Sequence, residues 1–106
     1  MLYVLNSPIL TNYGEYKFKK ISLQTAKNQL TKKKFISAVG HEATANLLTN
    51  ILNIEIPFNR QTIVMKPGDE AIVFKLLQRI PEGKVITTLE ELEKIGYEFG
   101  HLKMIK

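Results

Sequence analysis

The chain has 106 residues, of which 44% are hydrophobic and 24% are charged, and it contains no cysteine. This length is typical of a single domain, here residues 1–106, that buries enough apolar surface to fold without a structural metal or a disulfide bond. The formal net charge of +5 is compatible with an anionic partner, although lysines that only keep the surface soluble would give the same charge.

Neither membrane insertion nor export is supported by the sequence. No apolar run approaches the roughly 18 residues that cross a bilayer, and the first residues lack the pattern of a secretory signal peptide. The absence of cysteine fits a reducing compartment. We therefore expect a soluble, cytoplasmic protein without a membrane partner.

The first half of the chain combines short strands with helices. Apolar spacing predicts strands at about 2–5 and 16–21. A helix over about 23–32 follows, which Ser22 caps and the lysine run 32–34 ends. A buried strand is predicted at 35–39, and after a break at Gly40 a second helix runs over 42–52.

The second half is predicted to be richer in strands. Strands at 62–65 and 71–77 flank a turn at 67–69. A capping box at 88–91 opens a helix to about residue 95, and residues 97–104 alternate as a final strand. The predicted fold class is α+β, with one mixed or mostly antiparallel sheet of five or six strands and about three helices.

A histidine stands where the predicted strand 35–39 gives way to the helix 42–52. His41 follows Gly40, and the free amides and the dipole of a helix start favour an anion there. Glycine lets the backbone approach a phosphate closely, and a histidine so placed can protonate the departing oxygen of a phosphodiester. A lone histidine at a helix start is more often a capping or surface residue, so that alternative stays open.

A second charged segment follows the predicted strand 71–77. Arg79 can hold two phosphate oxygens and offset the charge of a pentacoordinate transition state. Glu82, three residues on, can take a proton from a ribose hydroxyl or hold Arg79 in place, and a simple ion pair in a turn remains an open alternative. Because metal-binding, Walker, dinucleotide and nucleophile-elbow motifs are absent, cleavage without a metal is favoured by elimination.

Four short motifs in order give the chain a family resemblance. They are Leu5–Asn6 after the first strand, Gly40–Thr44, Asn59–Arg60 and Gln78–Lys84. With this spacing, nearly the whole chain resembles the viral ring nucleases, which are small anti-CRISPR proteins of archaeal viruses, phages and prophage regions.

The resemblance implies an enzyme and its substrate. Members of that family are homodimers that bind cyclic tetra-adenylate and cut it to linear di-adenylates, which counteracts type III CRISPR signalling. The 2′-hydroxyl of the substrate would attack the adjacent phosphate and leave a 2′,3′-cyclic phosphate, so no metal and no cofactor is implied. His41 would be the general acid, Arg79 the group that stabilises the transition state, and Glu82 a positioning or basic group.

The resemblance also implies which residues hold the ring. They are Asn6, Gly40, Thr44, Asn59, Arg60 and Gln78. Archaeal-virus members carry a serine a few residues after the first-strand asparagine, and here Ser7 or Thr11 stands near that place. On this hypothesis the protein acts in the host-cell cytoplasm and duplex nucleic acid is not a partner.

A second hypothesis belongs to another functional class. A small, non-catalytic regulator of a virus or mobile element could bind nucleic acid through the lysine-rich surface that the charge of +5 implies. Turnover of cyclic tetra-adenylate in the presence of a chelator separates the two hypotheses.

Overall fold

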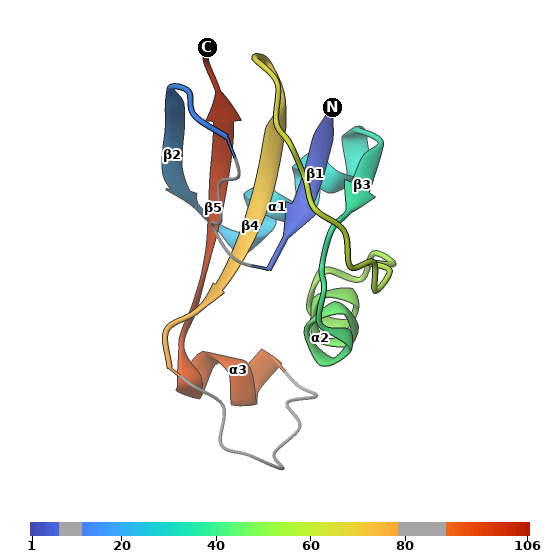
Figure 1. The fold of residues 1–106 in the computed structure, drawn as a ribbon. Coiled ribbons are helices and arrows are strands. Elements are labelled where there is room, and N and C mark those ends of the chain that lie inside the picture. The colour runs from blue at the N-terminus through green and yellow to red at the C-terminus, as the bar shows by residue number, and fades with distance from the viewer. Residues whose placement is uncertain (7–11, 79–88) are drawn as a thin grey trace.

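The computed structural model describes residues 1–6, 12–78 and 89–106 (Figure 1). Eight elements follow one another in this part of the chain: β1 (Leu2–Leu5), β2 (Tyr16–Ile21), α1 (Leu23–Lys32), β3 (Phe35–Ser37), α2 (Glu42–Leu52), β4 (Glu70–Leu76), α3 (Leu89–Ile95) and β5 (Tyr97–Met104).

The five strands of the described residues form one mixed sheet. Its order is β2-β5-β4-β1-β3. The short strand β1 is parallel to both of its neighbours, β3 and β4, whereas β5 is antiparallel to β4 and to β2. This sheet and its three helices confirm the predicted α+β class.

The helices cover one face of the sheet and a stretch of irregular chain covers the other. Alternation along β1 and β4 sends Val4, Ile72 and Phe74 toward the helices, where they meet buried leucines of all three helices, among them Leu48 and Leu92. The opposite face carries a smaller core, over which the segment before β4 passes (Figure 1). Its buried members are Leu5, Ala38, Met65, Ala71, Val73, Leu102 and Met104.

Capping residues at both ends of α1 and at the carboxyl end of α3 agree with the sequence, whereas Thr88, the first residue of the predicted capping box, lies outside the described residues. The Ser22 hydroxyl accepts a hydrogen bond from the Thr25 amide at 3.1 Å, and Lys32 occupies the last turn of α1. Gly96 follows α3 with a φ of 91°, a left-handed conformation that suits glycine after a helix.

The predicted strand at 62–65 is wrong. That segment is not one of the strands of the described sheet, although Met65 is buried and Ile63 half-buried against the sheet face. Alternating burial therefore arises because the segment packs across the sheet, and the same alternation would be expected of a paired strand.

The strand predicted at 35–39 ends earlier, at Ser37. The Ser37 hydroxyl donates to the Pro57 carbonyl at 2.6 Å and accepts from the Val39 amide at 3.3 Å. A side chain that binds neighbouring backbone groups in this way competes with the strand ladder. Val39 then forms only an isolated parallel bridge with Phe58.

None of the helices within residues 1–6, 12–78 and 89–106 is both long enough and apolar enough to cross a bilayer.

Candidate functional site

Two of the four motifs leave the sheet at the same end because their strands are parallel neighbours. Asn6 follows β1 directly, and the chain after β3 reaches Gly40 and His41 before α2 begins. The ends of parallel strands, where each chain turns away from the sheet, are where ligands bind in many mixed and parallel sheets. Asn6 is half-buried there, so part of its side chain is accessible.

His41 is the residue that caps the start of α2. Its backbone is extended, with φ −136° and ψ 117°, and its carbonyl accepts the Ala45 amide at 3.0 Å. The imidazole makes no capping hydrogen bond. It is exposed, and its Nδ1 lies 3.4 Å from the Thr44 hydroxyl. The side chain is therefore available to a ligand at the positive end of the helix dipole.

Arg60 packs closely against Gly40, the residue just before His41. A Cβ built on Gly40 would lie 3.2 Å from Cγ of Arg60, which is tighter than most real contacts. The arginine stem thus packs over the glycine that precedes His41, and Arg60 is exposed. An arginine and a histidine carried this close to one helix start suit an anionic ligand.

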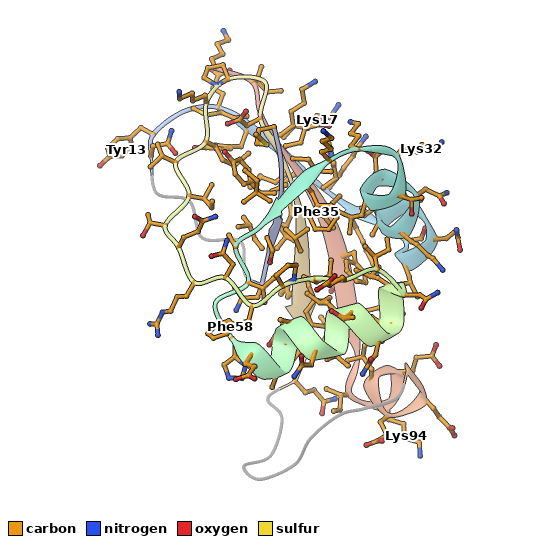
Figure 2. All side chains as sticks on the ribbon, turned by 90° about the vertical axis from the view of Figure 1, so that its right-hand side faces the viewer. Tyr13, Lys17, Lys32, Phe35, Phe58 and Lys94 are labelled. Carbon is orange, nitrogen blue, oxygen red and sulfur yellow. The ribbon has the colours of Figure 1, made fainter. Side chains whose placement is uncertain are left out.

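Asn59 fastens the arginine-bearing segment to the end of β3. Its backbone amide donates to the Val39 carbonyl at 3.0 Å, and its side-chain amide donates to the Ser37 carbonyl at 2.6 Å. Phe58, just before it, lies beside the amino-terminal end of α2 (Figure 2). These two contacts give Asn59 a structural role, because they hold the segment that carries Arg60 against the end of β3.

Gln78 is not brought to the same place. The register pairs Leu5 with Val73, and β4 continues to Leu76, so at the usual rise per residue it extends about 10 Å past the end of β1. Gln78 follows that extension. The structure thus gathers Asn6, Gly40, His41, Thr44, Asn59 and Arg60, while Ser7, Thr11, Arg79 and Glu82 lie outside the described residues.

In residues 1–6, 12–78 and 89–106, no three histidine, cysteine, aspartate or glutamate side chains gather in a way that could hold a metal ion. The groups present at the start of α2 are an imidazole, a guanidinium, a hydroxyl and an amide. They can bind an anion, orient it and deliver a proton.

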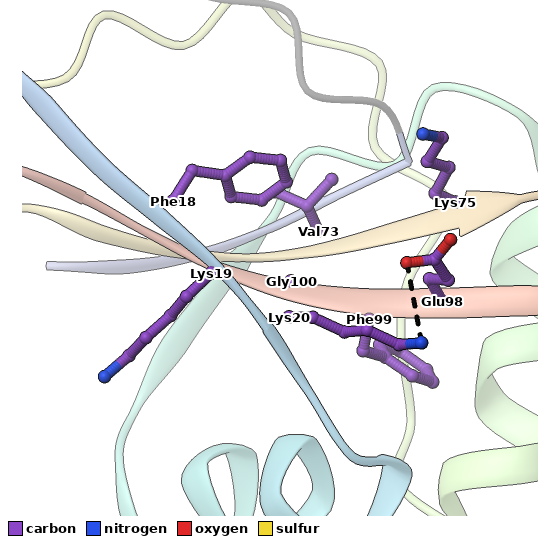
Figure 3. A pocket seen from close by; sticks show the side chains of 8 residues that line it. All are labelled: Phe18, Lys19, Lys20, Val73, Lys75, Glu98, Phe99 and Gly100. Carbon is purple, nitrogen blue, oxygen red and sulfur yellow. Dashed lines mark ion pairs between the residues drawn. The ribbon is translucent and has the colours of Figure 1, made fainter.

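A shallow pocket of about 120 Å³ lies elsewhere, on the sheet face opposite the helices (Figure 3). Phe18 packs over Gly100, so that a Cβ on this glycine would lie 2.3 Å from the aromatic ring. Lys75 lines the other side, and Lys20 pairs with Glu98 at 3.9 Å. The sequence signal for this surface is an aromatic residue between lysines on one strand, at positions 17–20, and it contradicts the expectation that no basic tract of the chain contains an interleaved aromatic residue.

A charged cluster was also missed. Nε2 of His101 lies 2.8 Å from one carboxylate oxygen of Glu70, and Nζ of Lys33 lies 3.1 Å from the other. Burial alone would raise the pKa of Glu70, but the hydrogen bonds and charges of Lys33 and His101 outweigh burial and hold that pKa below its ordinary value. No sequence pattern links three residues so far apart in the chain.

Comparison with known proteins shows what the chain is similar to. A family model described as STIV B116-like matches residues 2–99. A protein of the Sulfolobus islandicus filamentous virus is 48% identical over 99% of this chain and 92% of its own length. The YddF protein of Bacillus subtilis is 39% identical over 90% of this chain and 89% of its own length.

Among solved structures, B116 of Sulfolobus turreted icosahedral virus superimposes with a TM-score of 0.82. That match covers 96% of this chain and 97% of the other at 22% identity, so it bears on the fold alone. The names of these proteins state no activity.

Proposed function

Because the chain belongs to the STIV B116-like family, which has members in archaeal viruses, we propose that it is a ring nuclease. It binds cyclic tetra-adenylate and cleaves it to linear di-adenylates with 2′,3′-cyclic phosphate ends. The motifs that resemble the viral ring nucleases support this substrate, and the geometry at the start of α2 supports phosphodiester chemistry.

One observation carries the proposal. The imidazole of His41 stands exposed and uncapped at the start of α2, and Arg60 packs over the adjacent Gly40. A phosphate drawn to this helix start by its amides and by the guanidinium would lie within reach of a proton donor. Thr44, one turn on, contacts the same imidazole and can fix its orientation.

The chemistry needs no external nucleophile. The 2′-oxygen of a ribose forms a bond to the adjacent phosphorus while the bond from phosphorus to the 5′-oxygen breaks. The leaving 5′-oxygen takes a proton from His41, and the 2′-hydroxyl gives up its proton to a base, for which Glu82 is the candidate. Arg79 offsets the charge that develops on the equatorial phosphate oxygens.

The proposed working form is a homodimer in the host-cell cytoplasm. A two-fold axis matches a ring of four identical nucleotides, since each subunit can then present one copy of the site to one of two equivalent phosphates. Removal of the ring would silence the defence nucleases that this messenger activates.

The test is incubation of cyclic tetra-adenylate with the protein in excess chelator. We expect the wild type to release linear di-adenylates, and His41→Ala to lose at least about 100-fold in rate, the usual contribution of a general acid, while it still binds the ring. Asn50→Ala, an exposed change at the far end of the same helix, is the matched control and should cleave normally.

The alternative function is non-catalytic binding of nucleic acid. The exposed Phe18 shares its face of the sheet with Lys20 and Lys75, and an aromatic side chain beside lysines is a common arrangement for stacking bases next to a phosphate backbone. Strongly salt-dependent binding to nucleic acid without any turnover of the ring would favour this alternative.

A further inference from the structure

A pocket of about 210 Å³, lined mostly by residues with polar or charged side chains, lies between α1 and the strands β2, β5 and β4. Its lining residues are Lys19, Ile21, Thr25, Gln29, Glu70 and His101. We propose that this pocket is a second ligand site, which binds the phosphate group of a small phosphate monoester of pentose size.

The carboxylate in the pocket does not oppose an anion. One oxygen of Glu70 contacts Nε2 of His101 at 2.8 Å and the other contacts Nζ of Lys33 at 3.1 Å. Both oxygens are thus engaged by donors, and the charge of Glu70 is offset within the protein. Its effect is to hold the imidazole and one ammonium group in place.

The groups that remain for a ligand are mostly donors. The Thr25 hydroxyl accepts from Ser22 at 2.9 Å, which leaves its own proton for a phosphate oxygen. Gln29 supplies an amide and Lys19 an ammonium group. Because Nε2 of His101 faces Glu70, Nδ1 can share a proton with the phosphate, whichever of the two carries it.

The charge around the pocket is positive. Lys19 and His101 face each other in the ladder of β2 and β5, and Glu70 faces Lys103 in the ladder of β4 and β5. The helix that closes the pocket, α1, contains no acidic residue. Lysines therefore outnumber carboxylates around the pocket, which favours an anion over a cation or a neutral ligand.

The volume limits the ligand. Pockets for drug-sized molecules usually measure about 300–1,000 Å³, so about 210 Å³ accommodates a phosphate with one sugar-sized group rather than a whole dinucleotide. Ile21 supplies an apolar wall for the carbon skeleton. Ribose 5-phosphate has the right size, and the ribose phosphate part of AMP has the same chemistry.

This site is separate from the start of α2. Three strand-to-strand steps separate β5 from β3 in the sheet, which is roughly 14 Å at the usual strand spacing. The inference does not depend on ring cleavage, and its failure would leave that proposal unaffected.

The experiment is an NMR titration of the full chain with ribose 5-phosphate, with inorganic phosphate and AMP as separate arms. We expect saturable shifts at the pocket residues, and about tenfold weaker binding in Lys19→Gln and in His101→Gln, as for loss of one charge-assisted hydrogen bond. If inorganic phosphate bound as tightly as ribose 5-phosphate, the proposal that the pocket also holds a sugar-sized group would be contradicted.

The control is Lys20→Gln, which removes the same charge from the next residue of β2. Lys20 aligns with Gly100 and pairs with Glu98 on the other face of the sheet, whereas Lys19 leaves β2 on the side opposite to Phe18 (Figure 3). Equal weakening by Lys19→Gln and Lys20→Gln, or no saturable shift at millimolar ester, would overturn the proposal.

Discussion

At the scale of single residues, the distance between Gly40 and Arg60 governs how the proposed site is shaped. The arginine stem fits against the glycine with little room to spare, since an added Cβ would meet Cγ of Arg60 at 3.2 Å. The φ of Gly40 is not in the left-handed region, so a substitution there acts through this contact and not through backbone strain.

We therefore predict that Gly40→Ala weakens binding of cyclic tetra-adenylate several-fold and leaves the fold intact. The added methyl group pushes the Arg60 stem outward by a few tenths of an ångström and moves its guanidinium. Isothermal titration of the inactive His41→Ala protein measures the affinity. In an Arg60→Ala background the same change should have no further effect, and a full additional loss there would refute the contact.

A second residue-scale prediction concerns pH and stability. The pKa of Glu70 lies below the ordinary value of 4.5 in the folded chain, so its contacts contribute stability that is present above pH 4.5 and is lost as the pH falls through the lower, folded pKa. Glu70→Gln should therefore differ most from the wild type at neutral pH, and the difference should shrink in acid.

Urea unfolding at several pH values measures that difference. Glu15→Gln is the control, because Glu15 also faces a lysine but is exposed and 3.9 Å from Lys106. If the free energies of unfolding of Glu70→Gln and the wild type differed by the same amount from neutral to strongly acidic pH, the lowered pKa of Glu70 would be contradicted.

At the scale of elements, the packing of Phe18 over Gly100 ties β2 to β5. The aromatic ring covers a glycine whose Cβ would lie 2.3 Å away, and it remains 51% exposed. We predict that Gly100→Ala lowers the free energy of unfolding by about 1–2 kcal/mol, because the ring is driven off the sheet.

A double-mutant cycle tests this contact. In a Phe18→Ala background, Gly100→Ala should cost little or nothing, since the ring that it would displace is gone. Thermal or urea unfolding of the four proteins gives the coupling energy. Fully additive losses would show that the glycine is required for some other reason.

The helices and strands also show how far the sequence predicts the fold. The helices α1 and α2 and the strand β5 follow from local signals, which are caps, helical spacing and alternation, and all three are confirmed. Buried and exposed residues also alternate along the segment 62–65, although this segment is not a strand of the sheet. The alternation arises there because the segment packs across the sheet face. Alternation reports which side chains are buried and leaves open what buries them.

In the candidate site, too, local patterns predict the residues that are neighbours in the sequence and not the contacts between distant ones. Gly40 and His41 are neighbours in the sequence. The predicted end of the strand before α2 therefore puts both at the start of that helix, where the structure has them. The anchoring of Asn59 to Ser37 and the contact of Glu70 with His101 join residues 22 and 31 positions apart. Such pairs depend on strand order and register, which local patterns do not determine.

At the scale of the whole molecule, strand order explains which motifs lie together. The parallel neighbours β1 and β3 release Asn6 and His41 at one end of the sheet, whereas β4 runs on past the end of β1 before the chain reaches Gln78. The polar pocket beside α1 lies on the other side of β4 and β1, so the two proposed ligand sites can be tested independently.

We predict that the chain forms a homodimer that binds one ring per two subunits. A ring of four nucleotides has two-fold symmetry, and a two-fold dimer can contact it through two identical surfaces. Light scattering with size-exclusion chromatography gives the mass, and isothermal titration gives the stoichiometry. A monomer that binds one ring per chain would rule out the symmetric complex.

Single-turnover cleavage of cyclic tetra-adenylate in excess chelator shows whether His41 protonates the leaving oxygen of a cyclic adenylate. We predict linear di-adenylates with 2′,3′-cyclic phosphate ends from the wild type, and a rate at least about 100-fold lower for His41→Ala at saturating protein. An intact ring with the wild type, or cleavage by His41→Ala within a few-fold of the wild-type rate, would contradict it.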